Sequence, residues 1–244
     1  LGVIGIAVGV VLLPELSRAL KAGDQADAQH LQNRSMEFAL GLTLPAAVGL
    51  MVMPAPIVAV LYERGQFTAI DTAMTAAALA AFASGLPAYV LTKVFQPAFF
   101  AREDMRTPMW FSLVTVVVNI AASLLFFPVY GHVAIAGATA LSAWVNVLLL
   151  AATLWWRGDF RPSPVTLRRI TFMLVASVVM GGVVWALLAA LPQFVGHDLL
   201  IVRILTVAAI VGVAVVAYFG VALLTGGIDR SELARVARPR RKNA

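Results

Sequence analysis

The sequence predicts an all-α membrane protein, a polytopic helical bundle with about seven transmembrane helices. Of the 244 residues, 61% are hydrophobic and only 12% are charged, whereas a soluble domain is about 25% charged. The apolar residues form runs of about 20, the length that a helix needs to cross a bilayer. None of these runs alternates with the period of a barrel strand, and lipid accepts only helices or closed barrels as spanning elements.

Six complete apolar runs and one shorter run can be placed along the chain. The complete runs are expected as helices at 38–61, 72–100, 108–128, 133–156, 170–191 and 200–224. The shorter run, 1–13, reaches toward Leu20 and has no polar lead-in, so we interpret it as a helix that is cut at its beginning. It lacks the charged n-region and the small-residue cleavage site of a signal peptide.

Basic residues predict the orientation of these helices. All but three of the 18 lysine and arginine residues fall in segments that the crossings place on one side of the membrane. These segments are 14–37, 102–107, 157–169 and the tail at 229–244. Arg64 and Arg203 fall on the other side, and Lys93 lies inside an apolar run. Because cytoplasmic loops carry the excess of positive charge, the C-terminus is expected inside.

The net charge of +6 does not indicate nucleic-acid binding, because the basic residues sit between apolar runs and in the tail. We expect that tail to lie against anionic lipid.

The residue patterns of enzymes are missing from this sequence. It contains no cysteine, and its three histidines, His30, His132 and His197, are expected in loops on different sides of the membrane. No Ser/His/Asp set, metal-ligand spacing or glycine-rich phosphate loop occurs. The acidic residues fall at helix ends or in loops, so the buried carboxylate that proton-coupled carriers use has no clear candidate. We therefore expect no catalytic residues, no bound metal and no cofactor.

Lys93 is the basic residue that an apolar run has to accommodate. It stands in "TKVFQPAFFAREDMRTP", residues 92–108. Nine helical residues place it roughly 13 Å deeper than Arg102, where a charge needs a wet cavity or a partner. Pro97 has no N–H to bond the carbonyl four residues earlier, which is that of Lys93. Two interpretations remain: Lys93 lines a polar cavity, or it extends its ammonium to the headgroups.

Polar side chains also form stripes on two neighbouring helices. Asn119 and Ser123 are four residues apart on one helix, and Thr139, Ser142 and Asn146 mark a stripe on the next. Their oxygens could hold a cation or contact a substrate. The alternative is hydrogen bonding between the helices, which contributes about 0.6 kcal/mol on average.

The two last runs, 170–191 and 200–224, carry few polar side chains beyond Ser177 and Thr206. They suit contact with an acyl or isoprenoid chain, or are simply peripheral helices.

Three motifs in order carry a resemblance to a known family. They are "GVIGIAVGVVLLPELSRAL" at 2–20, "LYERGQFTAID" at 61–71 and "KVFQPAFFAREDMRTP" at 93–108. Together they resemble the MurJ/MviN lipid II flippases of bacteria, which belong to the multidrug/oligosaccharidyl-lipid/polysaccharide exporter superfamily. Such proteins have fourteen helices, in two six-helix lobes around a central cavity followed by two more helices. The resemblance makes this chain a fragment that holds helices eight to fourteen.

The resemblance implies a domain organisation and a function. Residues 1–156 would form the C-terminal lobe, 157–228 the two additional helices and 229–244 a basic cytoplasmic tail. The protein would move lipid II from the inner to the outer leaflet of the bacterial inner membrane by alternating access. Its partners would be lipid II, membrane lipids and other cell-wall synthesis proteins, without nucleic acid. Another exporter of the superfamily, for a drug or a different lipid-linked glycan, and a non-transporting membrane scaffold are the alternatives.

The resemblance also assigns roles to individual residues. Lys93 matches the lysine of the family's K-V-x-x-P motif and would face the substrate cavity. Asn146 is a further candidate substrate contact because of its place in the polar stripe, and not because of the resemblance. The last two helices would form a groove for the undecaprenyl tail. In some members of the family, sodium is bound by an Asn and an Asp four residues apart and a Thr on the next helix. Asn119 and Thr139 fit this pattern, but Ser123 stands in place of the Asp, so sodium coupling does not carry over directly.

Overall fold

The computed structural model describes residues 2–195 and 199–226, with the side chains of 12–193 and 199–226. Within these ranges the chain forms helices and no strand, so the all-α prediction is confirmed. The helices are α1 (Gly2–Lys21), α2 (Gln25–Val52), α3 (Pro54–Tyr62), α4 (Ala69–Ser84), α5 (Leu86–Phe100), α6 (Arg106–Tyr130), α7 (His132–Trp156), α8 (Pro164–Ala190), α9 (Pro192–Val195) and α10 (Leu200–Thr225). His197 and the tail at 229–244 lie outside the described residues.

Six helices of the described chain are long and apolar enough to cross a membrane. They are α2, α4 together with α5, α6, α7, α8 and α10. α1, the run expected to be cut short, adds a helix of 20 residues beside them. This number agrees with the predicted bundle of about seven crossings.

The helix expected at 38–61 differs from the structure at both ends. α2 begins at Gln25, where the Asp24 carboxylate caps the helix by accepting a hydrogen bond from the Asp27 N–H at 2.9 Å. The apolar run marks only the part of the helix that suits lipid, and the polar first turns continue it outward. The helix then breaks at Met53, because Pro54 starts α3 and a proline is tolerated in a first helical turn but not inside. His30 therefore lies in a helix and not in the predicted loop.

The span expected at 72–100 consists of two helices, α4 and α5, that meet at Gly85. A methyl group on Gly85 would lie 2.8 Å from the Cα of Ala140 in α7. Only a glycine allows that approach of the two backbones. The junction thus sets α5 closely against α7, and α5 carries Lys93.

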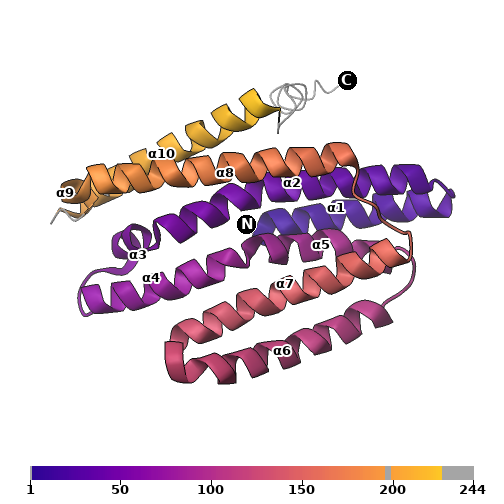
Figure 1. The fold of residues 1–244 in the computed structure, drawn as a ribbon, viewed down its shortest axis with the longest axis horizontal. Helices are drawn as coiled ribbons and strands as arrows, with labels where there is room; N and C mark the ends of the chain where they lie inside the picture. Colours follow the sequence, from indigo (N-terminus) through magenta and orange to yellow (C-terminus); the bar gives the residue numbers. More distant parts are fainter. Residues whose placement is uncertain (1, 196–198, 227–244) are drawn as a thin grey trace, which may run out of the picture.

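The helices run lengthwise beside one another, with α6 and α10 at opposite edges (Figure 1). One apolar cluster joins α1, α2, α5 and α7, with Leu16, Val94 and Leu150 at its centre. A second cluster, which includes Met53, Val184 and Tyr218, joins α8 and α10 to the end of α2. The turns α1–α2, α5–α6 and α7–α8 lie at the right-hand end of the view. Three of the basic segments therefore share one end of the bundle, which we call the basic end.

Candidate functional site

One stripe of α5 is open while the rest of the helix is buried. Val94 and Ala98 pack inside the bundle with no exposed surface, whereas Tyr89 and Lys93 are exposed and Gln96 is partly exposed. These three positions fall on one face, because residues four and seven apart in a helix are neighbours. The structure thus places Lys93 on an open polar face, and not among the residues of the core.

The ammonium of Lys93 makes no ion pair or hydrogen bond with any side chain that the structure describes. Pro97 lies buried inside α5, as expected. Because proline has no N–H, the carbonyl of Lys93 has no helical donor from that position. An ammonium and a carbonyl are therefore both available on the same turn, an arrangement that suits a polar ligand or water better than lipid.

The polar stripes of α6 and α7 meet at Asn119. Its Nδ2 donates to Thr139 Oγ1 at 3.2 Å and to Ser142 Oγ at 3.4 Å. Tyr89 of α5 joins the group, because its hydroxyl donates to the carbonyl of Thr139 at 3.2 Å. Two further predicted residues keep buried atoms without a hydrogen-bond partner, Ser123 Oγ and Asn146 Oδ1. The structure thus brings Asn119 and Thr139 together, and leaves Ser123 and Asn146 with unused polar capacity.

These residues do not fit a sodium ion well. Hard cations prefer several oxygen ligands, usually with a carboxylate among them. The Asn119 amide turns its N–H groups, which cannot bind a cation, toward the hydroxyls of Thr139 and Ser142. Ser123 supplies a neutral hydroxyl where the family pattern has an Asp. Among the described residues there is also no group of three or more His, Asp or Glu side chains that could hold a metal ion. The geometry favours hydrogen bonds that join α6 to α7.

Ion pairs at the basic end tie the α7–α8 linker to the neighbouring turns. Arg157 reaches Asp104 Oδ2 at 2.7 Å, and Arg102 reaches Asp159 at 3.0 Å. The hydrogen bonds from Arg157 and Thr107 lower the pKa of Asp104 to about 2. Arg102 and Arg157 entered the prediction of orientation, but their pairing with Asp159 and Asp104 was not predicted. Their opposite signs in segments at the same end were the available signal.

The first turns of α8 are held on α2 in a similar way. Glu37 accepts a hydrogen bond from Thr166 at 2.6 Å and pairs with Arg169 at 2.8 Å. Both contacts join residues that are far apart in sequence, which fixes α8 beside the first half of α2.

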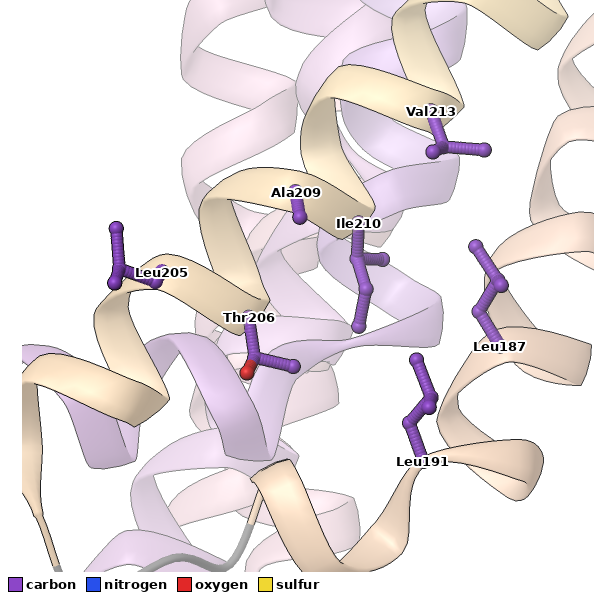
Figure 2. Close-up of a pocket in the computed structure, with 7 residues that line it drawn as sticks. All are labelled: Leu187, Leu191, Leu205, Thr206, Ala209, Ile210 and Val213. Carbon is purple, nitrogen blue, oxygen red and sulfur yellow. The ribbon is translucent and has the colours of Figure 1, made fainter.

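An apolar crevice of about 300 Å³ lies between α8 and α10. Its lining residues are Leu187, Leu191, Leu205, Thr206, Ala209, Ile210 and Val213. Figure 2 shows Leu187 and Leu191 opposite the residues of α10, with Thr206 as the sole polar side chain drawn. The surface suits a hydrocarbon chain.

These features define the chain as an α-helical membrane protein, with an open polar face around Lys93 and a separate apolar crevice. A family model described as lipid II flippase MurJ matches residues 1–206, and the chain belongs to this family.

Curated relatives agree with that assignment. A probable lipid II flippase MurJ of Rhizobium tropici is 45% identical over 230 residues, which cover 94% of this chain and 43% of the relative. The corresponding protein of Rhizobium meliloti (strain 1021) is 46% identical over 237 residues, 96% of this chain and 44% of the relative. The chain thus spans less than half the length of these relatives.

A solved structure shares the fold. The lipid II flippase MurJ in an inward closed conformation matches with a TM-score of 0.70 and 24% sequence identity. The match covers 96% of this chain and 45% of that structure. The likeness supports the arrangement of the helices described above.

Proposed function

We propose that the complete gene product containing this chain moves lipid II from the inner to the outer leaflet of the bacterial inner membrane. The observation that carries the proposal is the match of residues 1–206 to the lipid II flippase family. Relatives with that description are 45% and 46% identical to the chain. The activity is one of transport, so no bond of the substrate has to be made or broken.

Lys93 is the residue that we assign to the lipid II headgroup. Its ammonium is exposed on α5 and has no ion-pair partner among the described side chains. A pyrophosphate supplies the negative charge that an ammonium inside the membrane needs. Asn146, whose Oδ1 is buried and unpartnered, is the second polar position that a sugar hydroxyl could reach after a small movement of α7.

The crevice between α8 and α10 is assigned to the isoprenoid tail of the same substrate. It is lined almost entirely by aliphatic side chains, and burial of hydrocarbon contributes about 0.8 kcal/mol per methylene group. Asn119, Thr139 and Ser123 lie on α6 and α7, away from this crevice. We assign Asn119 and Thr139 to the contact between those two helices.

The basic end is assigned to the cytoplasmic side. Exposed Arg18, Lys21, Arg106 and Arg168 are found there, and positive charge next to a transmembrane segment is retained on the inside. Residues 1–156 would then form one lobe, and 157–228 the two helices that bind the isoprenoid chain. Residues 229–244 would form the C-terminal segment in the cytoplasm. Lipid II, membrane lipids and other cell-wall synthesis proteins are the partners that this placement implies.

The test replaces Lys93 in the complete gene product of cells that are depleted of the native copy. Lys93→Ala should lower the rate at which lipid II appears on the outer face by about tenfold or more, because a hydrogen bond to a charged group contributes about 1.5–3 kcal/mol. Lys93→Arg should retain much of the activity. Arg106→Ala, which removes an exposed cation at the basic end, is the matched control and should leave the rate unchanged.

Membrane levels of each variant are measured in parallel. Normal translocation by Lys93→Ala would remove Lys93 from the site. Unchanged translocation after depletion of the whole protein would refute the proposed activity itself.

A further inference from the structure

The hydroxyl of Tyr218 in α10 donates a hydrogen bond of 2.8 Å to the main-chain carbonyl of Gly41 in α2. The two residues are 177 positions apart, and Tyr218 is almost completely buried. A carbonyl inside an α-helix normally accepts from the N–H four residues later. For Gly41 that residue is Pro45, which has no N–H. The Tyr218 hydroxyl therefore takes the place of the helical donor that Pro45 lacks.

Each partner in this contact would otherwise be unsatisfied. A main-chain carbonyl without a donor is costly in a membrane-spanning helix, because lipid offers no substitute. The phenolic O–H has the same requirement when it is buried. The bond is therefore a specific attachment of α10 to the point where Pro45 interrupts the hydrogen-bond ladder of α2.

α8 packs against the same part of α2. A methyl group built on Gly181 would lie 2.7 Å from Cγ1 of Val48, so α8 approaches α2 closely there. The Met173 side chain of α8 lies against Gly41, with Cε 3.5 Å from the position of a Cβ on that glycine. α8 and α10, which form the two walls of the crevice, thus both contact α2 near Pro45.

The other end of α10 is attached to α3. Arg203 Nη1 lies 3.0 Å from Glu63 Oε1, and Thr72 donates to the second oxygen of the same carboxylate at 2.8 Å. The residues that line the crevice on α10, from Leu205 to Val213, lie between Arg203 and Tyr218 along the helix. Two polar attachments therefore bracket the crevice.

We propose that Tyr218 is a positioning residue for the isoprenoid chain, because it links the α8–α10 crevice to the proline interruption of α2. The assignment rests on the proposed function, which gives the crevice to that chain. Together with the Arg203–Glu63 pair, Tyr218 holds α10 at a fixed place on the lobe.

The test compares two lipids of different length in vesicles that contain the complete gene product. Tyr218→Phe removes only the hydroxyl. It should weaken binding of undecaprenyl phosphate by about threefold, the effect that an average hydrogen bond between membrane helices supports. Binding of dimethylallyl phosphate, whose single five-carbon unit is too short to span the crevice from Leu205 to Val213, should not change. Tyr130→Phe, the same replacement at an exposed tyrosine of α6, is the matched control.

A second substitution tests the physical cause. Pro45→Ala restores an N–H that can bond the Gly41 carbonyl, so Tyr218→Phe should have little further effect in that background. Pro45→Gly serves the same purpose if the alanine variant does not accumulate in the membrane. An equal loss from Tyr218→Phe in both backgrounds, an equal loss for both lipids, or no loss at all would overturn the proposal.

The same cycle is measured by thermal unfolding, which does not depend on any lipid. If the wild-type protein binds both lipids equally, the assignment of the crevice to the isoprenoid chain fails, and with it the positioning role. The unfolding cycle then still decides whether Tyr218 satisfies the carbonyl that Pro45 leaves open.

Discussion

Two adjacent glycines of α8 provide a sharp test of how closely this helix packs against α2. A methyl group on Gly181 would lie 2.7 Å from Val48 Cγ1 and 3.5 Å from Val52 Cγ2, whereas a methyl group on Gly182 would meet nothing within 4 Å. Gly181→Ala should therefore destabilise the contact between α8 and α2. Gly182→Ala should be neutral or slightly stabilising.

The magnitude follows from the contact distances. Two carbon atoms in van der Waals contact prefer a separation of about 3.5–4.0 Å, so α8 and α2 have to move apart by about 1 Å locally. Overpacking of this kind costs about 1–3 kcal/mol. Both substitutions gain the same helix propensity, about 1 kcal/mol in water. The difference in unfolding free energy between the two variants therefore reports the steric clash alone.

The assay is equilibrium unfolding of the complete gene product in mixed micelles, with both variants purified side by side. Gly181→Ala should be less stable than Gly182→Ala by about 1–3 kcal/mol. Equal stability of the two variants would show that α8 does not approach α2 at Gly181. The packing described for α8, which forms one wall of the crevice, would then have to be revised.

Two further predictions concern the basic end and the position of α5. Because the pKa of Asp104 is about 2 in the folded protein and 3.8 in the reference state, the contribution of its pairing to stability is present above about pH 4. It is lost as the pH falls toward 2, so an acid titration of stability should be flatter in that window for Asp104→Asn. Gly85→Ala, whose new methyl group would lie 2.8 Å from Ala140 Cα, should lower both thermal stability and lipid II translocation. Gly137→Ala has open space around it and should do neither; equal behaviour of the two variants would contradict the packing described for α5.

The membrane spans could be predicted from the sequence because lipid imposes a simple rule on the length and polarity of a helix. The start of α2 could not be predicted in this way. Asn33 accepts a hydrogen bond from the Ser163 N–H at 3.0 Å and donates to the Arg161 carbonyl at 3.3 Å. The polar first turns of α2 are thus stabilised by a linker about 130 residues away, which a hydropathy window does not include.

In the candidate site, too, features that depend on residue spacing could be predicted, whereas contacts between residues far apart in sequence could not. Local spacing predicted that Asn119 and Thr139 belong to facing polar stripes, and the structure joins them at 3.2 Å. The spacing of Pro97 and Lys93 likewise identified an interrupted turn. The sequence also contains Pro45, but nothing local indicates that a tyrosine of the last helix bonds the carbonyl at Gly41. Such a partner depends on the packing of α10 against α2, which only the structure describes.

The central claim is that Lys93 faces a water-filled cavity that receives the lipid II headgroup. The chain contains no cysteine, so Lys93→Cys provides a defined thiol once any cysteine outside residues 1–244 is replaced by serine. A charged thiol reagent reacts only with a thiol that water can reach. Val117→Cys, on the exposed apolar face of α6, is the control that lipid should protect.

The most direct measurement is therefore the rate of modification at position 93, with and without saturating lipid II. We predict fast modification of Lys93→Cys that lipid II slows, and slow modification of Val117→Cys under both conditions. If Lys93→Cys reacts as slowly as Val117→Cys, or at a rate that lipid II does not change, Lys93 does not line the substrate cavity.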